Sequence, residues 1–165
     1  MYNSHNMTNN LEDFIKGSII GYITGDALGS PYNTNKIPDD ILSVSMVYPS
    51  FDDHKLTGSY SEESSLMLCT LSSINEYQSF DIEDIMNRYQ QMYIGGYFVC
   101  NDELFSLSPS VSESINNYSE GIPVENCSIY DDVSCNDTQC LSRILPFSIN
   151  NPKYHKPLFC LFHPK

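Results

Sequence analysis

The sequence predicts an all-α protein, because apolar residues recur at helical spacing along most of the chain. The clearest case is residues 81–93, where apolar side chains lie three or four positions apart on one narrow face. These side chains are Ile82, Ile85, Met86, Tyr89 and Tyr93. The dipeptide Gly95-Gly96 follows directly and is typical of a helix end. A length of 165 residues suits one domain with an apolar core.

The first helix is expected to begin near Asn10, whose side chain can cap it, and residues 1–10 are expected to form a flexible tail. Its apolar stripe comprises Leu11, Phe14, Ile15, Ile19, Tyr22 and Ile23. Gly17, Gly21 and Gly25 lie four apart, so they line one face that another backbone could approach closely. Each glycine costs about 1 kcal/mol relative to alanine in a helix, so we expect packing to offset this cost.

The rest of the chain alternates loops and helices. Loops are expected at residues 30–40, 49–60 and 120–136, and a short strand at residues 42–48. Helices are expected at residues 61–75, with Leu68, Leu71 and Ile74 as the buried line, at residues 109–116 and at residues 138–149. The domain is therefore expected to span residues 11–149, with residues 150–165 as a C-terminal tail.

The charge excludes two classes of partner. A formal net charge of −13 offers nothing to neutralise phosphates, so we expect neither nucleic acid nor an anionic membrane surface. Carboxylates are instead hard oxygen ligands for divalent cations. We expect neither a signal peptide nor a membrane-spanning helix, and therefore an intracellular, cytoplasmic protein whose six cysteines are free thiols.

Three segments carry the residues that point to chemistry. The first is Gly25-Asp26-Ala27-Leu28-Gly29-Ser30-Pro31, the second is Ser61-Glu62-Glu63-Ser64, and the third is Cys140-Leu141-Ser142-Arg143-Ile144-Leu145-Pro146. In their order and rough spacing they resemble the ADP-ribosylglycohydrolase family, which has Gly-Asp-Ala-Leu-Gly-x-Pro, then Thr-Asp-Asp-Thr, then Asn-Gly-x-x-Met-Arg-Ile-x-Pro. The first match is close. The second keeps the chemical types, and the third lacks the preceding Asn-Gly.

The resemblance implies an orthogonal helical bundle of the ADP-ribosylglycohydrolase type, with two Mg²⁺ ions in a cleft. It assigns metal binding to Ser61, Glu62 and Glu63 and catalysis to Glu62 and Glu63. The family's other ligands come from a C-terminal Asp-x-Asp-Thr that has no counterpart here, so the resemblance implies a truncated bundle. It implies ADP-ribosylated protein or ADP-ribose as the ligand, and a second chain that completes the fold as a further partner.

The substitutions within the motifs bear on activity. Replacing Asp with Glu adds a methylene, about 1.5 Å of reach, to ligands of an ion that demands octahedral geometry. Asn33 stands where the family tends to carry a glutamate. Because the C-terminal metal ligands have no counterpart, and these substitutions add to that loss, we expect impaired cleavage of the bond between ADP-ribose and a protein side chain. The alternative is a non-catalytic relic that binds ADP-ribose or a protein partner.

Simpler interpretations accompany each assignment. Ser61 followed by two acids is also a good helix start, because Ser caps a helix and acids favour its N-terminus. Asp26 could cap or bond a neighbouring helix, and Arg143 could pair with an acid at the edge of the core. A zinc site from the set Cys135, Cys140, Cys160 and His163 is disfavoured by its loose spacing.

Overall fold

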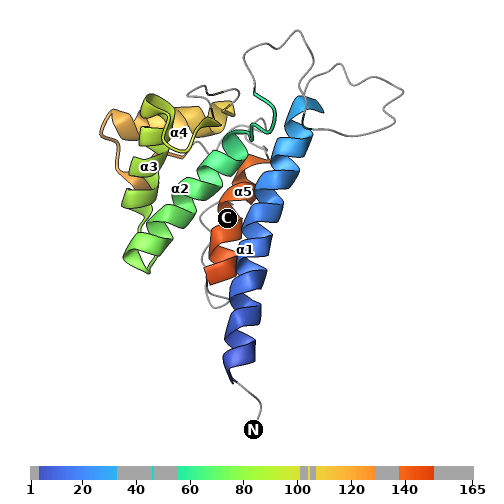
Figure 1. The fold of residues 1–165 in the computed structure, drawn as a ribbon. Helices are drawn as coiled ribbons and strands as arrows, with labels where there is room; N and C mark the ends of the chain where they lie inside the picture. The colour runs from blue at the N-terminus through green and yellow to red at the C-terminus, as the bar shows by residue number, and fades with distance from the viewer. Residues whose placement is uncertain are drawn as a thin grey trace. The chain divides into compact units, whose positions relative to one another are not determined.

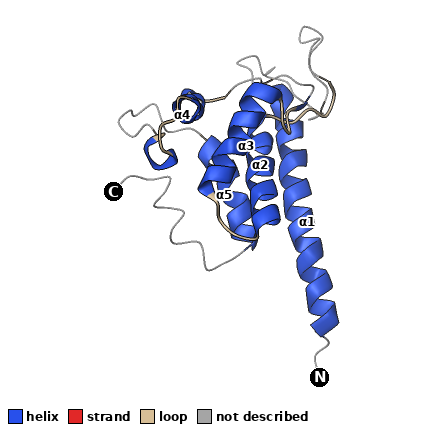
Figure 2. Ribbon diagram, turned by 90° about the vertical axis from the view of Figure 1, so that its left-hand side faces the viewer, coloured by secondary structure: helices blue, strands red, loops and turns tan. Residues whose placement is uncertain are grey.

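The computed structural model describes residues 4–32, 46, 56–100, 104, 107–128 and 138–150 (Figure 1). Within these residues the regular structure is helical and contains no strand, which confirms the all-α prediction (Figure 2). The chain divides into two compact units, Met1–Tyr60 and Ser61–Lys165, and each is described by itself.

The first unit contains the long helix α1, Ser4–Gly29, and the short 3-10 helix η1, Ser30–Tyr32. The helix begins six residues before Asn10, so the expected boundary at that residue is wrong. Its first residues contain neither glycine nor proline, and nothing in them stops a helix from extending. The helix ends two residues before Pro31, as expected where a proline disfavours helical backbone in the residue before it.

The glycines of α1 lie in open space within their unit. Among the described residues of this unit, no atom lies within 4 Å of where a Cβ would be placed at Gly17, Gly21 or Gly25. The expected close approach of another backbone is therefore not found there. The expected strand at residues 42–48 lies outside the described residues except for Met46, whose carbonyl accepts a hydrogen bond from the Gly58 N–H at 3.4 Å.

Within its described residues, the second unit contains four α-helices whose bounds lie close to those predicted, and one 3-10 helix inside the segment 120–136 that was expected to be a loop. They are α2, Glu62–Tyr77; α3, Ile82–Gly95; α4, Pro109–Ser119; the 3-10 helix η3, Val124–Asn126; and α5, Gln139–Asn150. Side chains cap three of the starts. Ser61, Asp81 and Ser108 each accept a hydrogen bond from a backbone N–H in the first turn of α2, α3 and α4.

The ends of α2 and α3 both use left-handed backbone. Gly96 ends α3 with φ of 72°, a conformation that glycine adopts without strain. Gln78 ends α2 with φ of 53°, and its N–H donates to the carbonyl of Ile74. Its side-chain Nε2 also donates to the Asn75 carbonyl at 2.6 Å, which helps to hold this less favoured backbone.

One core holds the second unit together. Helix α2 packs most extensively against α5 and then against α3, and α3 packs against α4 (Figure 2). The core residues are Leu66, Cys69, Ile74, Ile85, Tyr89, Met92, Val111, Ile115 and Phe147. The predicted apolar face of α3 is confirmed at Ile85 and Tyr89.

The buried face of α2 differs from the predicted one. Leu68 and Leu71 are only partly buried, and Ile74 is buried as expected. The face that packs instead carries Leu66, Met67, Cys69 and Thr70, so small and polar side chains share it with large apolar ones. Because α2 packs against two helices, its buried surface is wider than a single line of leucines predicts.

Candidate functional site

The acidic pair of the second motif lies in the first turn of α2, as predicted. Ser61 precedes the helix with extended backbone, and its Oγ accepts a hydrogen bond from the Glu63 N–H at 3.2 Å. Glu62 is 2% exposed and Glu63 is half-buried. Acidic side chains in the first turn of a helix are favourable because the helix N-terminus carries partial positive charge.

The residue two positions before the third motif contacts this acidic pair. The Thr138 Oγ1 donates a hydrogen bond to the Glu63 Oε1 at 2.8 Å, and Gln139 then opens α5. Thr138 lies 75 residues from Glu63 in sequence. Helix α5, which contains the third motif, packs against α2, which begins at the second motif, within one unit.

The start of α5 is anchored by polar contacts. Gln139 is buried, and its Oε1 accepts a hydrogen bond from the Ser108 N–H at 3.0 Å. Arg143 lies one turn further and is half-buried. Its Nε donates to the Gln139 carbonyl at 3.1 Å. These contacts tie the start of α5 to the start of α4.

A buried polar pair lies behind the acidic turn, between α2 and α3. The hydroxyls of Thr70 and Tyr89 are 2.6 Å apart, and the Thr70 Oγ1 also donates to the Leu66 carbonyl at 3.0 Å. Burial raises the pKa of Tyr89 to about 12, against the lowering effects of the Arg143 charge and the Thr70 hydrogen bond. Tyr89 is therefore a neutral structural group at physiological pH.

The first motif belongs to the other unit, at the end of α1 and in η1. Ala27 and Pro31 are buried there, and Asp26 is half-buried.

The donor chemistry of Ser61, Glu62 and Glu63 suits Mg²⁺, which prefers hydroxyl and carboxylate oxygens. The set is only partial, however. In the part of the chain that the structure describes, no group of three or more His, Cys, Asp or Glu side chains is placed to hold a metal ion. The residues of the second unit therefore fit part of a magnesium shell. Cys135, Cys160 and His163 of the disfavoured zinc set lie outside the described residues.

A second charged cluster was missed from the sequence, although its Asp84–Arg88 spacing of four residues could have revealed it. Arg88 is buried on α3, and its guanidinium contacts Asp84 and Glu76, each at 2.6 Å. It also donates to the Ser72 Oγ at 2.8 Å. Burial acts to raise the pKa of Asp84, but the hydrogen bond from Arg88 and the Arg88 charge help to outweigh it, and that pKa is lowered. The cluster ties α2 to α3 and is structural.

Comparison with known proteins places this helical domain in a class of metal-dependent hydrolases. The sequence model of the ADP-ribosylglycohydrolase family matches residues 7–157. The chain belongs to the ADP-ribosylglycohydrolase family. Neither the curated proteins nor the solved structures contain a match. Among the described residues, no helix is both long enough and apolar enough to cross a membrane.

Proposed function

We propose that this protein acts on ADP-ribose linked to a protein side chain, through the acidic first turn of α2, and cleaves the glycosidic bond only weakly. The observation that carries the proposal is the pair Glu62 and Glu63 at a capped helix start, in contact with the start of α5. Family membership supports the substrate class.

The chemistry requires a group that stabilises positive charge. Hydrolysis of a glycosidic bond passes through an oxocarbenium-like state, which carboxylates beside the ribose stabilise. Glu62 and Glu63 would supply those carboxylates, with the Ser61 hydroxyl beside them. Mg²⁺, when bound, would orient the ribose and the attacking water. The same three residues would hold that ion.

Two features of these residues support weak catalysis. Each acid is a glutamate and is one methylene longer than aspartate, so its carboxylate stands about 1.5 Å further from the backbone than the geometry of a magnesium site needs. Glu63 is also engaged by Thr138, which directs one of its oxygens toward α5. Both features would keep the donor oxygens of Glu62 and Glu63 away from the octahedral positions that Mg²⁺ requires.

The test measures release of ADP-ribose from an ADP-ribosylated protein, with and without Mg²⁺. We expect slow release that depends on Mg²⁺ and disappears in the double variant Glu62→Gln, Glu63→Gln. The matched control is Glu113→Gln, Glu120→Gln, which removes two exposed acids of α4 and its C-cap. Equal loss in both double variants would reject the proposed site.

The same proteins distinguish the second candidate, a non-catalytic protein that binds ADP-ribose. Calorimetric titration with free ADP-ribose would then show binding in the wild-type chain, with no release in the turnover assay. Binding that is unchanged when Glu62 and Glu63 are replaced by Gln would place the ADP-ribose site elsewhere in the molecule.

A further inference from the structure

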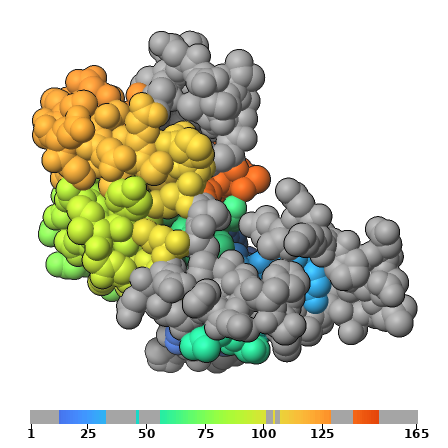
Figure 3. All heavy atoms as spheres, turned by 90° about the horizontal axis from the view of Figure 1, so that it is seen from above, coloured from blue at the N-terminus to red at the C-terminus, as the bar shows by residue number. Residues whose placement is uncertain are grey.

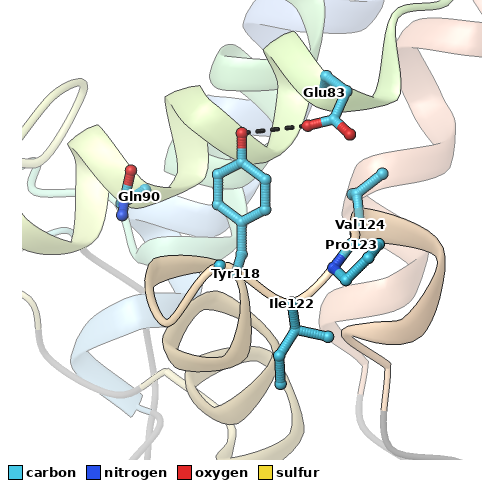
Figure 4. Close-up of a pocket in the computed structure, with 7 residues that line it drawn as sticks. Glu83, Gln90, Tyr118, Ile122, Pro123 and Val124 are labelled. Carbon is cyan, nitrogen blue, oxygen red and sulfur yellow. Dashed lines mark hydrogen bonds between the residues drawn. The ribbon is translucent and has the colours of Figure 1, made fainter.

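A pocket of about 370 Å³ opens on the second unit, between α3, α4 and the segment that leads into η3 (Figure 4). Glu83 and Gln90 of α3 and Tyr118 of α4 line one side, and Ile122 and Pro123 line the other. In Figure 3 the side chains of α3, α4 and this segment form one continuous surface. The pocket lies away from the acidic turn of α2 and plays no part in the proposed hydrolysis.

Hydrogen bonds hold the walls of this pocket in place. The Tyr118 hydroxyl donates to the Glu83 Oε2 at 3.2 Å, so the phenol ring spans from α4 to α3 (Figure 4). The Gln90 Nε2 donates to the Ser119 Oγ at 2.8 Å and joins the same two helices. Gly121, with φ of 85°, reverses the chain after α4 and brings Ile122 and Pro123 to the opposite wall.

The surroundings of the pocket carry negative charge. The pKa of Tyr118 is raised mainly by burial, and the negative charges of Glu83 and Asp81 also contribute. The pKa of Cys127, the residue directly after η3, is likewise raised mainly by burial. The negative charges of Glu83 and Glu125 raise it further. These acids come from two segments of the chain, so their combined field favours a cationic ligand and opposes a phosphate or carboxylate.

We propose that this pocket binds the side chain of an arginine on a partner protein. The apolar stem of the arginine would lie along Ile122 and Pro123. Its guanidinium would pair with the Glu83 carboxylate, which can accept further hydrogen bonds beside that from Tyr118. It would also stack on the Tyr118 ring as a cation–π contact. Arginine fits better than lysine, because a planar guanidinium can stack and pair at once.

The volume agrees with a single side chain. Pockets for whole small molecules are typically about 300–1,000 Å³, and this one lies near the lower limit. An arginine and part of a neighbouring partner residue would fit in such a pocket, and the rest of the partner would lie on the surface formed by α3 and α4.

The test is an NMR titration of the isotope-labelled full chain with a capped pentapeptide, Gly-Gly-Arg-Gly-Gly. We expect saturable shift changes in the pocket-lining residues of α3, α4 and the η3 segment. A second peptide replaces the arginine by citrulline, which keeps the shape and removes the charge. It should bind about tenfold more weakly, because both the ion pair and the cation–π contact depend on charge.

Variants of the chain locate the contact. Glu83→Gln should weaken arginine binding about tenfold, and Tyr118→Leu should weaken it several-fold through loss of the ring. Tyr118→Phe keeps the ring and releases the Glu83 oxygen, so its affinity should equal or exceed that of the wild type. The matched control, Glu113→Gln, removes an exposed acid of α4 that does not line the pocket and should change nothing.

The spectrum of each variant also shows whether it is folded. Wild-type affinity in Glu83→Gln would overturn the proposal. Equal binding of the citrulline peptide, or shift changes confined to residues away from the pocket, would also overturn it.

Discussion

The Thr138 hydroxyl donates a hydrogen bond of 2.8 Å to the Glu63 carboxylate, and so joins the start of α5 to the start of α2 across 75 residues of sequence. The residue two positions before the third family segment therefore contacts the acidic pair of the second segment. The contact gives Glu63 a fixed direction, which a solvated glutamate at a helix start would lack.

The first prediction concerns this contact. Thr138→Val removes the hydroxyl and keeps the branched shape, so it should lower the free energy of unfolding by about 0.5–1.5 kcal/mol. Thr138→Ser keeps the hydroxyl and should cost less than half as much. Urea denaturation measures both values. A loss in Thr138→Ser as large as that in Thr138→Val would show that the methyl group contributes as much as the hydrogen bond, and would contradict this expectation.

The second prediction concerns Arg88. Arg88→Met should destabilise the chain by about 3 kcal/mol, because it leaves the largely buried Asp84 carboxylate without its cationic partner. Glu76→Gln is the matched control. The Glu76 side chain is 61% exposed, so losing its ion pair should cost at most about 1 kcal/mol. A loss in Glu76→Gln as large as that in Arg88→Met would contradict this ranking.

The third prediction is a pH dependence that comes from Asp84. The folded state lowers the pKa of this carboxyl, so the unfolded chain binds its proton more readily. The resulting stabilisation is fully present above the unfolded-state pKa of about 3.9 and is lost as pH falls through the lower folded-state value. The free energy of unfolding should fall over that acid range, and less steeply in Asp84→Asn. Parallel curves for the two proteins would disprove the assignment.

The fourth prediction compares two glycines of the first unit. Gly21→Ala should stabilise the helix by up to about 1 kcal/mol, since a Cβ meets nothing within 4 Å among the described residues of this unit. Gly58→Ala should instead destabilise by about 1–2 kcal/mol, because Gly58 has φ of 85°. Thermal unfolding followed by circular dichroism measures both. A destabilised Gly21→Ala variant would show that the α1 glycines do face a neighbour.

Local pattern predicted most of the second unit. The helical spacing of apolar residues in 81–93, with the glycines after them, predicted α3. Ser61 followed by two acids predicted the start of α2. The buried face of α2 was wrong at Leu68 and Leu71, because its packing against both α3 and α5 depends on tertiary structure. Similarly, the sequence placed Glu63 at a helix start but could not reveal Thr138 as its partner. A contact across so many residues carries no periodic signal.

At the start of α1, a local sequence signal predicted a boundary that the structure does not have. Asn10 is a good capping residue, yet the helix continues back to Ser4. A capping side chain permits a helix to begin but does not require it, and no glycine or proline before Asn10 forces a boundary.

We propose that Glu62 and Glu63 of α2 occupy the catalytic positions of an ADP-ribose-cleaving site, and that their side chains are too long to catalyse well. The most direct measurement compares Mg²⁺-dependent release of ADP-ribose by the wild-type chain and by the variant Glu62→Asp, Glu63→Asp. We predict release at least about tenfold faster in the aspartate variant, a gain of about 1.4 kcal/mol in transition-state stabilisation. Release that is equal or slower in a folded aspartate variant would contradict the claim.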